Sequence, residues 1–447
     1  MSLGIISIGS GVIAAAALFG PACLAARADE RSKATGVEPL PPRGVAYHWT
    51  PEQQIVGYMK RMQIEPTRMV GVGDGSNVRH LPLVVHQISP HWTWHGQPMD
   101  VDRYMEATRV SGVIVLKDAK ILYERYGVGR TAKDHWDGQS TTKSVTALLI
   151  GAAIQDGYIK DMGSLVTDYI PELKGSAYEG VTISQLATMT SGVKWDETLL
   201  DQQWKEPFVN GVNPTVAFMS RLPRANEPGT KFSYSSADSD LAGILVSRAV
   251  GRSLAEYLSV KIWQPYGMEK EAYWVTDAAG IERGGGTLLT TLRDFARIGQ
   301  FVLEGGKAGD IQVLPRDWLA QATEAQLILS ASDGFGFLGA VGYGYNWWTY
   351  KDHFAAIGHA GQRIFIYPKD NVVIALNSVW PEDHAKDYYP MEQPFIEALH
   401  TAAAALAERA DCSYGCFRNL QAPDAAMEGI SIICCWAGFG YRTQHRT

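Results

Sequence analysis

Alternating and apolar runs near the two ends of the chain predict strands. Residues 112–116 and 121–126 flank a polar four-residue turn, and residues 364–367 and 372–377 flank a turn that begins with Pro368. Each pair is typical of a β-hairpin, because turn-forming residues separate two short runs of strand-forming residues. The sequence therefore predicts one hairpin near each end of the main region.

Helical patterns occupy the region between these hairpins. A helix is predicted over residues 141–155, where Asp156-Gly157 ends it, and an Ala-rich closing helix over residues 394–409. Residues 164–303 follow a mostly helical pattern that Gly and Pro interrupt. This order predicts an α+β fold (an α/β sandwich), in which an antiparallel sheet built from both chain ends is flanked by helices. A mostly helical subdomain is inserted beside it.

The N-terminal residues 1–28 are predicted to be a secretory signal peptide. Residues 1–26 carry no charge and include an apolar run at 12–19, and Ala26-Arg27-Ala28 has the small-x-small pattern of a cleavage site. We therefore expect an exported protein, periplasmic or secreted. The alternative is an uncleaved membrane anchor, since the uncharged stretch is long enough to span a bilayer.

Three further regions are expected along the chain. Residues 29–100 hold few periodic segments and many turn formers, which predicts a loop-rich N-terminal wrap. Residues 101–410 carry the predicted sheet and helices and form the expected main domain. Residues 411–447 mix Cys pairs, Gly and isolated apolar residues without periodicity, so we expect a poorly ordered tail.

Composition excludes several classes of function. The net charge is -7 and no basic stripe is present, so a nucleic-acid partner is not expected. No Cys lies between Ala28 and Asp411, which removes a disulfide framework, a thiolate nucleophile and a Cys-type zinc site from the central region. No metal or organic cofactor is implied.

The first candidate motif is Ser140-Thr141-Thr142-Lys143 at the start of a predicted helix. Residues three apart in a helix share a face, so the Lys143 side chain can reach the Ser140 hydroxyl. A serine hydroxyl becomes an effective nucleophile when a neighbouring group takes its proton. The same tetrad also fits a serine that merely caps a helix.

The second candidate is Tyr234, which follows a Pro-Gly turn and precedes a helical pattern. Its phenol could share a proton with Ser140 and Lys143 and later protonate a leaving group. Read alone, it fits a buried core tyrosine with a satisfied hydroxyl better than a catalytic residue.

The third candidate is His359-Ala360-Gly361-Gln362, ahead of the strand at residues 364–367. A Gly beside an edge strand allows close backbone approach, so the Gln362 N–H is predicted to complete an oxyanion hole with the N–H of Ser140. Trp347 and its neighbour Trp348 either wall a substrate site or belong to the core.

Together the three motifs resemble the serine β-lactamase and penicillin-binding-protein superfamily, whose signature is S-x-x-K, then S-D-N, then K-T-G. Tyr234 follows Ser140 by 94 residues, and His359 follows Tyr234 by 125. The second motif is similar to the Y-x-N of class C β-lactamases. Residues 185–193 and 284–297 resemble two connecting segments of the superfamily, and residues 151–157 and 234–241 resemble its 6-aminohexanoate-dimer hydrolase and esterase branch.

This resemblance implies a β-lactamase-like serine hydrolase domain that cleaves a small-molecule amide or ester through an acyl-enzyme on Ser140. Lys143 and Tyr234 would be catalytic, and a second set of residues would bind the oxyanion or substrate: Gln362, Gly361, His359, Ser236 and Trp347. The chain departs from the pattern at His359, which replaces a Lys, at Ser236, which replaces an Asn, and at Leu199, which replaces a Tyr.

These departures leave the substrate open. A non-turnover binding or sensor protein, a β-lactamase and a D-alanyl-D-alanine peptidase remain alternatives. The sequence does not fix the oligomeric state.

Overall fold

The computed structural model describes residues 39–329, 335–380 and 385–417. The chain divides into two compact units, Met1–Ala404 and Ala405–Thr447, and the first contains the sheets and the candidate site. The predicted signal peptide lies outside the described residues, as does most of the predicted tail. Among the residues described, no helix is both long enough and apolar enough to cross a membrane.

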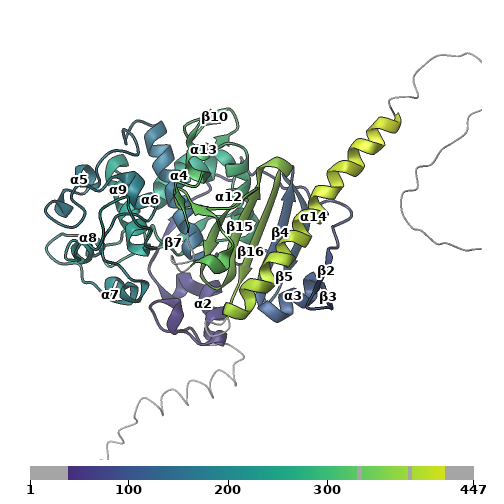
Figure 1. The fold of residues 1–447 in the computed structure, drawn as a ribbon, viewed down its shortest axis with the longest axis horizontal. Helices are drawn as coiled ribbons and strands as arrows, with labels where there is room; N and C mark the ends of the chain where they lie inside the picture. The colour runs from purple at the N-terminus through teal and green to yellow at the C-terminus, as the bar shows by residue number, and fades with distance from the viewer. Residues whose placement is uncertain (1–38, 330–334, 381–384, 418–447) are drawn as a thin grey trace, which may run out of the picture. The chain divides into compact units, whose positions relative to one another are not determined.

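An eight-stranded antiparallel sheet forms the centre of the first unit (Figure 1). The last strand in sequence, β16, pairs with β4, so that Ala375 lies opposite Ile114. The predicted sheet built from both chain ends is therefore confirmed, and so are both hairpins. In spatial order the strands are β11 (Leu327–Ile328), β12 (Gly342–Tyr343), β13 (Trp348–Thr349), β14 (Phe354–Gly358), β15 (Gln362–Tyr367), β16 (Val372–Ser378), β4 (Val110–Lys117) and β5 (Lys120–Tyr126).

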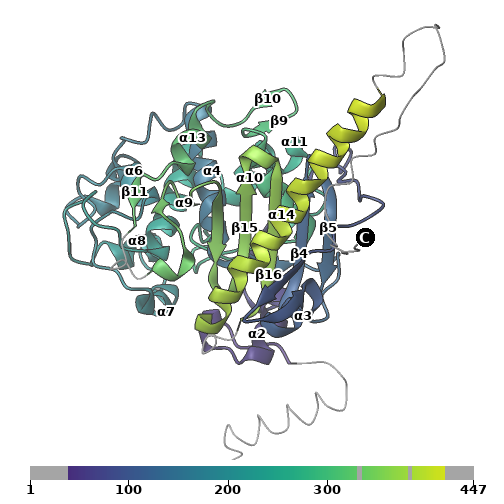
Figure 2. The same cartoon turned by 45° about the vertical axis from the view of Figure 1, so that its right-hand side comes forward.

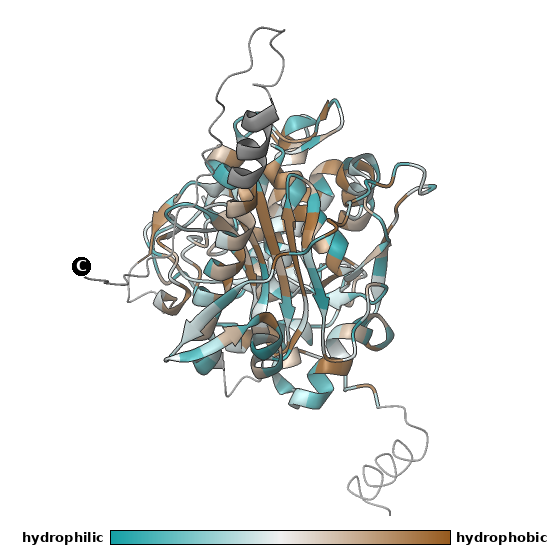
Figure 3. Cartoon of the chain, turned by 90° about the vertical axis from the view of Figure 1, so that its right-hand side faces the viewer, coloured by the Kyte–Doolittle hydropathy of each residue, from teal (hydrophilic) through white to brown (hydrophobic). Residues whose placement is uncertain are grey.

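The adjacent strands β16 and β4 of this sheet are buried along their whole length. All residues of β4 and β16 are buried, and the strands are strongly apolar (Figure 3). One face is covered by the part of α14 (Ala385–Phe417) that belongs to the first unit, which lies across the sheet in Figure 2 and shares a hydrophobic cluster with it through Phe395, Leu399, Val113 and Ile374. The closing helix is thus longer than the predicted 394–409.

The opposite face is covered by α12 (Leu292–Leu303) at very short range. A Cβ built on Gly299 would lie 2.6 Å from Val373 Cγ1 and 2.7 Å from Ile364 Cγ2. Real Cβ atoms do not approach other carbons this closely, so only a glycine permits this helix–sheet distance.

A mostly helical region lies beside the sheet, as predicted (Figure 1). Its two longest members, α4 and α9, contribute to the main hydrophobic core through Leu148, Leu149, Leu241 and Leu245. The helices are α4 (Thr142–Gln155), α5 (Val166–Tyr169), α6 (Ile183–Ala187), α7 (Leu200–Trp204), α8 (Pro214–Met219), α9 (Ser236–Val250), α10 (Leu254–Leu258), α11 (Gln264–Tyr266) and α13 (Trp318–Thr323).

A second sheet of four strands brings the site segments together. β6 pairs with β8, with Trp136 opposite Thr290 and Asp137 opposite Leu289, so the segment before Ser140 lies next to a distant loop. The order is β1 (Thr67–Val70), β7 (Ala272–Val275), β8 (Leu288–Thr290) and β6 (Trp136–Asp137). Two hairpins complete the strands, β2 (His91–Trp94) with β3 (Gln97–Asp100) and β9 (Lys307–Ala308) with β10 (Ile311–Gln312).

The prediction of a loop-rich wrap over residues 29–100 is wrong for its central part. Residues Pro51–Ile64 form the 14-residue helix α2, and α3 (Val101–Thr108) follows the β2–β3 hairpin. The Thr50 side chain accepts a hydrogen bond from Gln53 N, and the Gln53 side chain accepts one from Thr50 N. This capping box, with Pro51 at the first helical position, is a helix-start signal that the loop prediction overlooked.

The close packing of α12 on the sheet yields a prediction about stability. Gly299→Ala should lower the free energy of unfolding by about 1–3 kcal/mol, because the added methyl group overpacks the helix–sheet contact. Urea unfolding followed by fluorescence measures this. Gly336→Ala is the matched control, since a Cβ there would meet nothing within 4 Å. Equal stability of the two variants would contradict the packing argument.

Candidate active site

Ser140 lies in a short 3-10 turn, Gln139–Thr141, that leads directly into α4. The preceding Gln139 has a φ of 49°, which is uncommon for a residue with a side chain. Asp137 holds it there: its carboxylate accepts hydrogen bonds from Gln139 N at 2.8 Å and from Gln139 Nε2 at 2.7 Å. Burial raises the pKa of Asp137, and the charge of Arg61 opposes that rise. Ser140 is thereby fixed at the start of the helix.

Lys143 is buried, and three oxygen atoms surround its Nζ. The distances are 2.8 Å to Ser140 Oγ, 3.0 Å to Ser236 Oγ and 2.6 Å to the Gly285 carbonyl oxygen. The predicted contact between Ser140 and Lys143 is therefore present. The structure adds Ser236 and Gly285 as direct partners of the lysine.

Ser236 stands where the superfamily has an Asn, and it takes part in the lysine network. Its hydroxyl donates to Glu197 Oε2 at 2.7 Å, and its backbone N–H donates to Glu197 Oε1 at 2.8 Å. Trp195 Nε1 also donates to Glu197 Oε1, at 2.7 Å. Because the Ser236 proton is used by Glu197, its oxygen is left to accept from Lys143.

Asp240 fixes the Gly285 carbonyl from the other side. Its Oδ1 accepts a hydrogen bond at 2.7 Å from the backbone N–H of Gly285, the same residue whose carbonyl oxygen accepts from Lys143. Burial raises the pKa of Asp240 to about 6, although the charges of Arg283 and Lys143 work against that shift. The loop that carries the lysine acceptor is thus anchored to α9.

Tyr234 lies beside Lys143, half-buried, with its ring centroid 5.0 Å from Nζ. The ring packs near Trp348 at 6.1 Å and Phe335 at 5.3 Å. The structure therefore brings together all three predicted catalytic residues. Contact of the Tyr234 ring with the lysine is established by geometry, while the proton-relay role of its hydroxyl remains a prediction.

The third motif approaches Ser140 through Gly358, at the end of β14. A Cβ built on Gly358 would lie 3.1 Å from Ser140 N and 2.7 Å from the Gly138 carbonyl oxygen. Gln362 sits opposite Gly358 on β15 and is fully buried. Its side-chain Nε2 donates hydrogen bonds to backbone carbonyl oxygens, including that of Ser378 at 2.7 Å. The oxyanion role of its N–H stays a prediction.

Two expected substrate-binding residues pack against the protein interior. Trp347 is fully buried and packs edge-on against Phe354 in the main core, which is the core alternative stated for it. Gly361 has a φ of 87°, and a Cβ there would lie 2.7 Å from both Ser378 Cβ and Trp380 Cε2. Only a glycine therefore fits at this position, and a role of its backbone in binding substrate stays a prediction.

His359 packs its imidazole edge-on against Tyr47, with centroids 4.7 Å apart. Tyr47 belongs to the short helix η1 (Ala46–His48) and lines the pocket that contains Ser140. His359 itself lines a separate hollow under α14. Its influence on the Ser140 pocket therefore passes through Tyr47.

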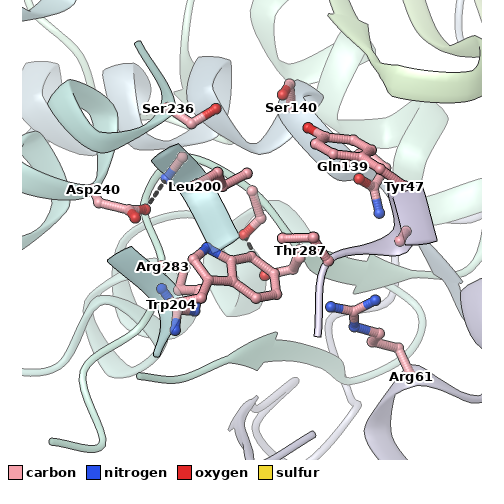
Figure 4. A pocket seen from close by; sticks show the side chains of 14 residues that line it. Tyr47, Arg61, Gln139, Ser140, Leu200, Trp204, Ser236, Asp240, Arg283 and Thr287 are labelled. Atoms are coloured by element: carbon pink, nitrogen blue, oxygen red, sulfur yellow. Dashed lines mark hydrogen bonds between the residues drawn. The ribbon is translucent and has the colours of Figure 1, made fainter. Parts of the chain in front are cut away.

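The pocket at Ser140 is shown in Figure 4. Ser140 and Ser236 lie along one side, and two arginines, Arg61 and Arg283, lie on the other side with Trp204. Sequence reasoning missed both arginines, together with Glu197 and Asp240. For Asp240 a signal existed, since it belongs to residues 234–241, which resemble a segment of the superfamily. Across the residues that the structure describes, no cluster of His, Cys, Asp or Glu could hold a metal ion.

Comparisons with known proteins agree with this geometry. Residues 100–391 match the beta-lactamase family. The 6-aminohexanoate-dimer hydrolase of Paenarthrobacter ureafaciens is 27% identical over 314 residues, which covers 66% of this chain and 79% of that protein.

Two solved structures share the fold. A Bacillus anthracis protein provisionally assigned as a 6-aminohexanoate-dimer hydrolase has a TM-score of 0.69 at 22% identity, covering 80% of this chain and 98% of that one. EstCE1, a hydrolase with promiscuous acyltransferase activity, has a TM-score of 0.52 at 14% identity, with 68% and 96% covered. With the match to most of its main domain, the chain belongs to the beta-lactamase family and is a serine hydrolase.

Proposed function

We propose that this hydrolase cleaves an amide or ester through a covalent acyl-enzyme on Ser140. The observation that carries the proposal is the position of Lys143 Nζ, 2.8 Å from Ser140 Oγ and bonded to two further oxygens. Ser140 attacks the substrate carbonyl and loses its proton to the lysine, and the C–N or C–O bond then breaks, so that the amine or alcohol leaves with a proton and the acyl-enzyme remains. Water then attacks the acyl-enzyme and releases the product acid.

The donors and acceptors around Lys143 support this lysine as the base that takes the Ser140 proton. The Gly285 carbonyl can only accept, and the Ser236 hydroxyl already donates to Glu197. A neutral lysine amine has two N–H donors and one lone pair. If the two donors serve Gly285 and Ser236, the lone pair is directed at the remaining neighbour, which is the hydroxyl of Ser140. The protonated lysine instead donates to all three.

Tyr234 is proposed to pass a proton to the leaving group. The position of its ring next to Lys143 supports a place for Tyr234 in the same proton relay. The N–H groups of Ser140 and Gln362 are proposed to bind the oxyanion, and Gly358 at the end of β14 allows that strand to approach Ser140.

The proposed substrate is a small linear amide or ester. The similarity to a 6-aminohexanoate-dimer hydrolase supports a linear amide, and the fold shared with EstCE1 is compatible with an ester. His359 in place of the family's Lys argues against a β-lactam. We also propose that the protein is exported through its N-terminal segment, on the small-x-small pattern that ends at Ala28.

The nucleophile assignment predicts the behaviour of two neighbouring serine variants. Ser140→Ala should lower kcat/KM for p-nitrophenyl esters about a thousandfold or more, because no acyl-enzyme can form. Ser144→Ala is the matched control: Ser144 is one turn further along α4, is buried and donates to Asn346 O. It should retain activity within a few-fold. Full esterase activity of Ser140→Ala would contradict the proposal.

The role of Ser236 generates a second prediction. Ser236→Ala removes one acceptor from Lys143, and kcat should fall about 10-fold to 100-fold, since a hydrogen bond to a charged group contributes about 1.5–3 kcal/mol. Ser236→Asn should recover much of the loss, because its amide oxygen can accept from Lys143 while its NH₂ group donates to Glu197. Steady-state kinetics with matched circular dichroism spectra measure both. An unaltered kcat in Ser236→Ala would show that the lysine does not need this acceptor.

A further inference from the structure

Two buried guanidinium groups line the pocket that Ser140 opens into. Arg61 comes from α2 and Arg283 from the loop that leads into β8, and both point toward the pocket from the side opposite the two serines (Figure 4). Arg61 has no exposed surface, and Arg283 is 6% exposed. An arginine is almost never buried without partners, so the two require an explanation.

Their hydrogen-bonding capacity is only partly used. Among the described residues, Nε and Nη1 of Arg61 and Nε and Nη1 of Arg283 have no hydrogen-bond partner. Arg61 Nη2 donates to the Gly44 carbonyl oxygen at 2.7 Å. A buried donor on a cation that lacks a partner is costly, which indicates that these N–H groups are kept for a ligand.

The nearby carboxylates do not complete the arginines. Around Arg61, Glu65 Oε1 lies 3.8 Å from Nη2 and Asp137 Oδ2 lies 4.0 Å from Nε, both beyond hydrogen-bond distance. Within the described part of the chain Arg283 has no carboxylate partner within 4.0 Å, because Asp240 is engaged by Gly285 N and Asp277 by Asn213 and backbone N–H groups. Burial lowers the pKa of Arg283, the charges of Asp240 and Asp277 oppose this, and the charge of Arg61 adds to it.

Indole rings orient both guanidinium groups. Arg283 Cζ lies 4.2 Å from the Trp204 ring centroid, and Arg61 Cζ lies 4.6 Å from that of Trp49 and 5.5 Å from that of Trp204. Stacking on an indole fixes the plane of a guanidinium and leaves its edge free for hydrogen bonds. The donor edges are therefore oriented before any ligand arrives.

We propose that this pocket is an anion subsite in which Arg283 binds a carboxylate of the substrate and Arg61 supplies a second positive charge. The proposal rests on the proposed function, because it places the carboxylate on the molecule whose amide or ester bond Ser140 attacks. Arginine matches a planar carboxylate through paired N–H donors. A monoanion suits the site better than a phosphate dianion, since Asp137 and Asp240 keep negative charge nearby.

Substitution of Arg283 tests the anion subsite with fewer side effects than substitution of Arg61. Arg61 also faces Asp137, which holds Gln139 beside Ser140, so its removal would disturb the nucleophile itself. Arg283 makes no such contact, and it is the one with exposed surface. Arg283→Met keeps the length of the side chain and its packing on Trp204 while it removes the charge.

Paired substrates test the subsite. On the acyl side, the mono-p-nitrophenyl ester of glutaric acid is compared with its methyl-capped diester. On the leaving-group side, 4-acetoxybenzoate is compared with its methyl ester. In at least one pair, the unchanged protein should have a kcat/KM about tenfold or more higher for the substrate with the free carboxylate than for its methyl ester. A desolvated arginine that loses its charged partner is left unpaired, and the tenfold difference corresponds to about 1.4 kcal/mol. In Arg283→Met this preference, taken as the ratio of kcat/KM within each pair, should fall to about twofold or less.

Arg248→Met is the control for loss of one positive charge. Arg248 lies on α9, pairs with Glu172 and does not line the Ser140 pocket. It should keep the preference. No preference in either pair, or a preference that persists in Arg283→Met, would overturn the subsite.

Binding of glutarate to Ser140→Ala, followed by tryptophan fluorescence, provides a readout that does not need turnover. We expect saturable binding that Arg283→Met, made in the same background, weakens at least about tenfold. Binding by both proteins with equal affinity, or by neither, would overturn the subsite. If Ser140→Ala still hydrolysed esters while glutarate binding depended on Arg283, the proposed nucleophile would be wrong and the subsite would stand.

Discussion

The contact between Lys143 and three oxygen atoms is the constraint on which the rest of the site depends. A lysine side chain is long and flexible, and holding it buried against Ser140 costs conformational entropy. Hydrogen bonds to the Gly285 carbonyl and the Ser236 hydroxyl offset that cost. They also orient the lysine Nζ so that its remaining hydrogen-bonding direction faces Ser140. Glu197 and Asp240 act one step further out, since each fixes one of these two acceptors.

The fold explains why such distant segments meet at one lysine. Pairing of β6 with β8 aligns the segment before Ser140 with the glycine loop that carries Gly285. The packing of α4 against α9 sets Lys143 opposite Ser236. On the remaining side, β14 of the large sheet ends at Gly358, beside the backbone of Ser140. The site therefore lies where the helical region and both sheets converge.

Much of this arrangement could be predicted from the sequence, for physical reasons. The two hairpins and the helix after Ser140 follow from local periodicity, and the catalytic trio follows from three ordered motifs. Burial is different, because it depends on contacts between distant segments. Trp347 was a candidate for the site and lies in the core, and Gly361 was a candidate for oxyanion binding and packs on Ser378.

Other parts could not be found from spacing at all. Arg61 and Arg283 have no sequence motif in common, and they meet only because α2 packs next to the loop that leads into β8. The helix α2 does have a local signal in its capping box, but the turn-forming residues on both sides of it favour a loop. The role of Ser236 was obscured by comparison with Asn, although a hydroxyl can also accept from the lysine.

The most direct test of the account is the rate at which a fluorophosphonate labels Ser140, with the labelled peptide located by mass spectrometry. The account predicts one modified residue, Ser140, and a labelling rate that falls about a hundredfold or more in Lys143→Met, because general-base assistance typically contributes 10²–10⁴-fold. Label on another residue, no label, or an equal rate in Lys143→Met would contradict the claim that Lys143 activates Ser140.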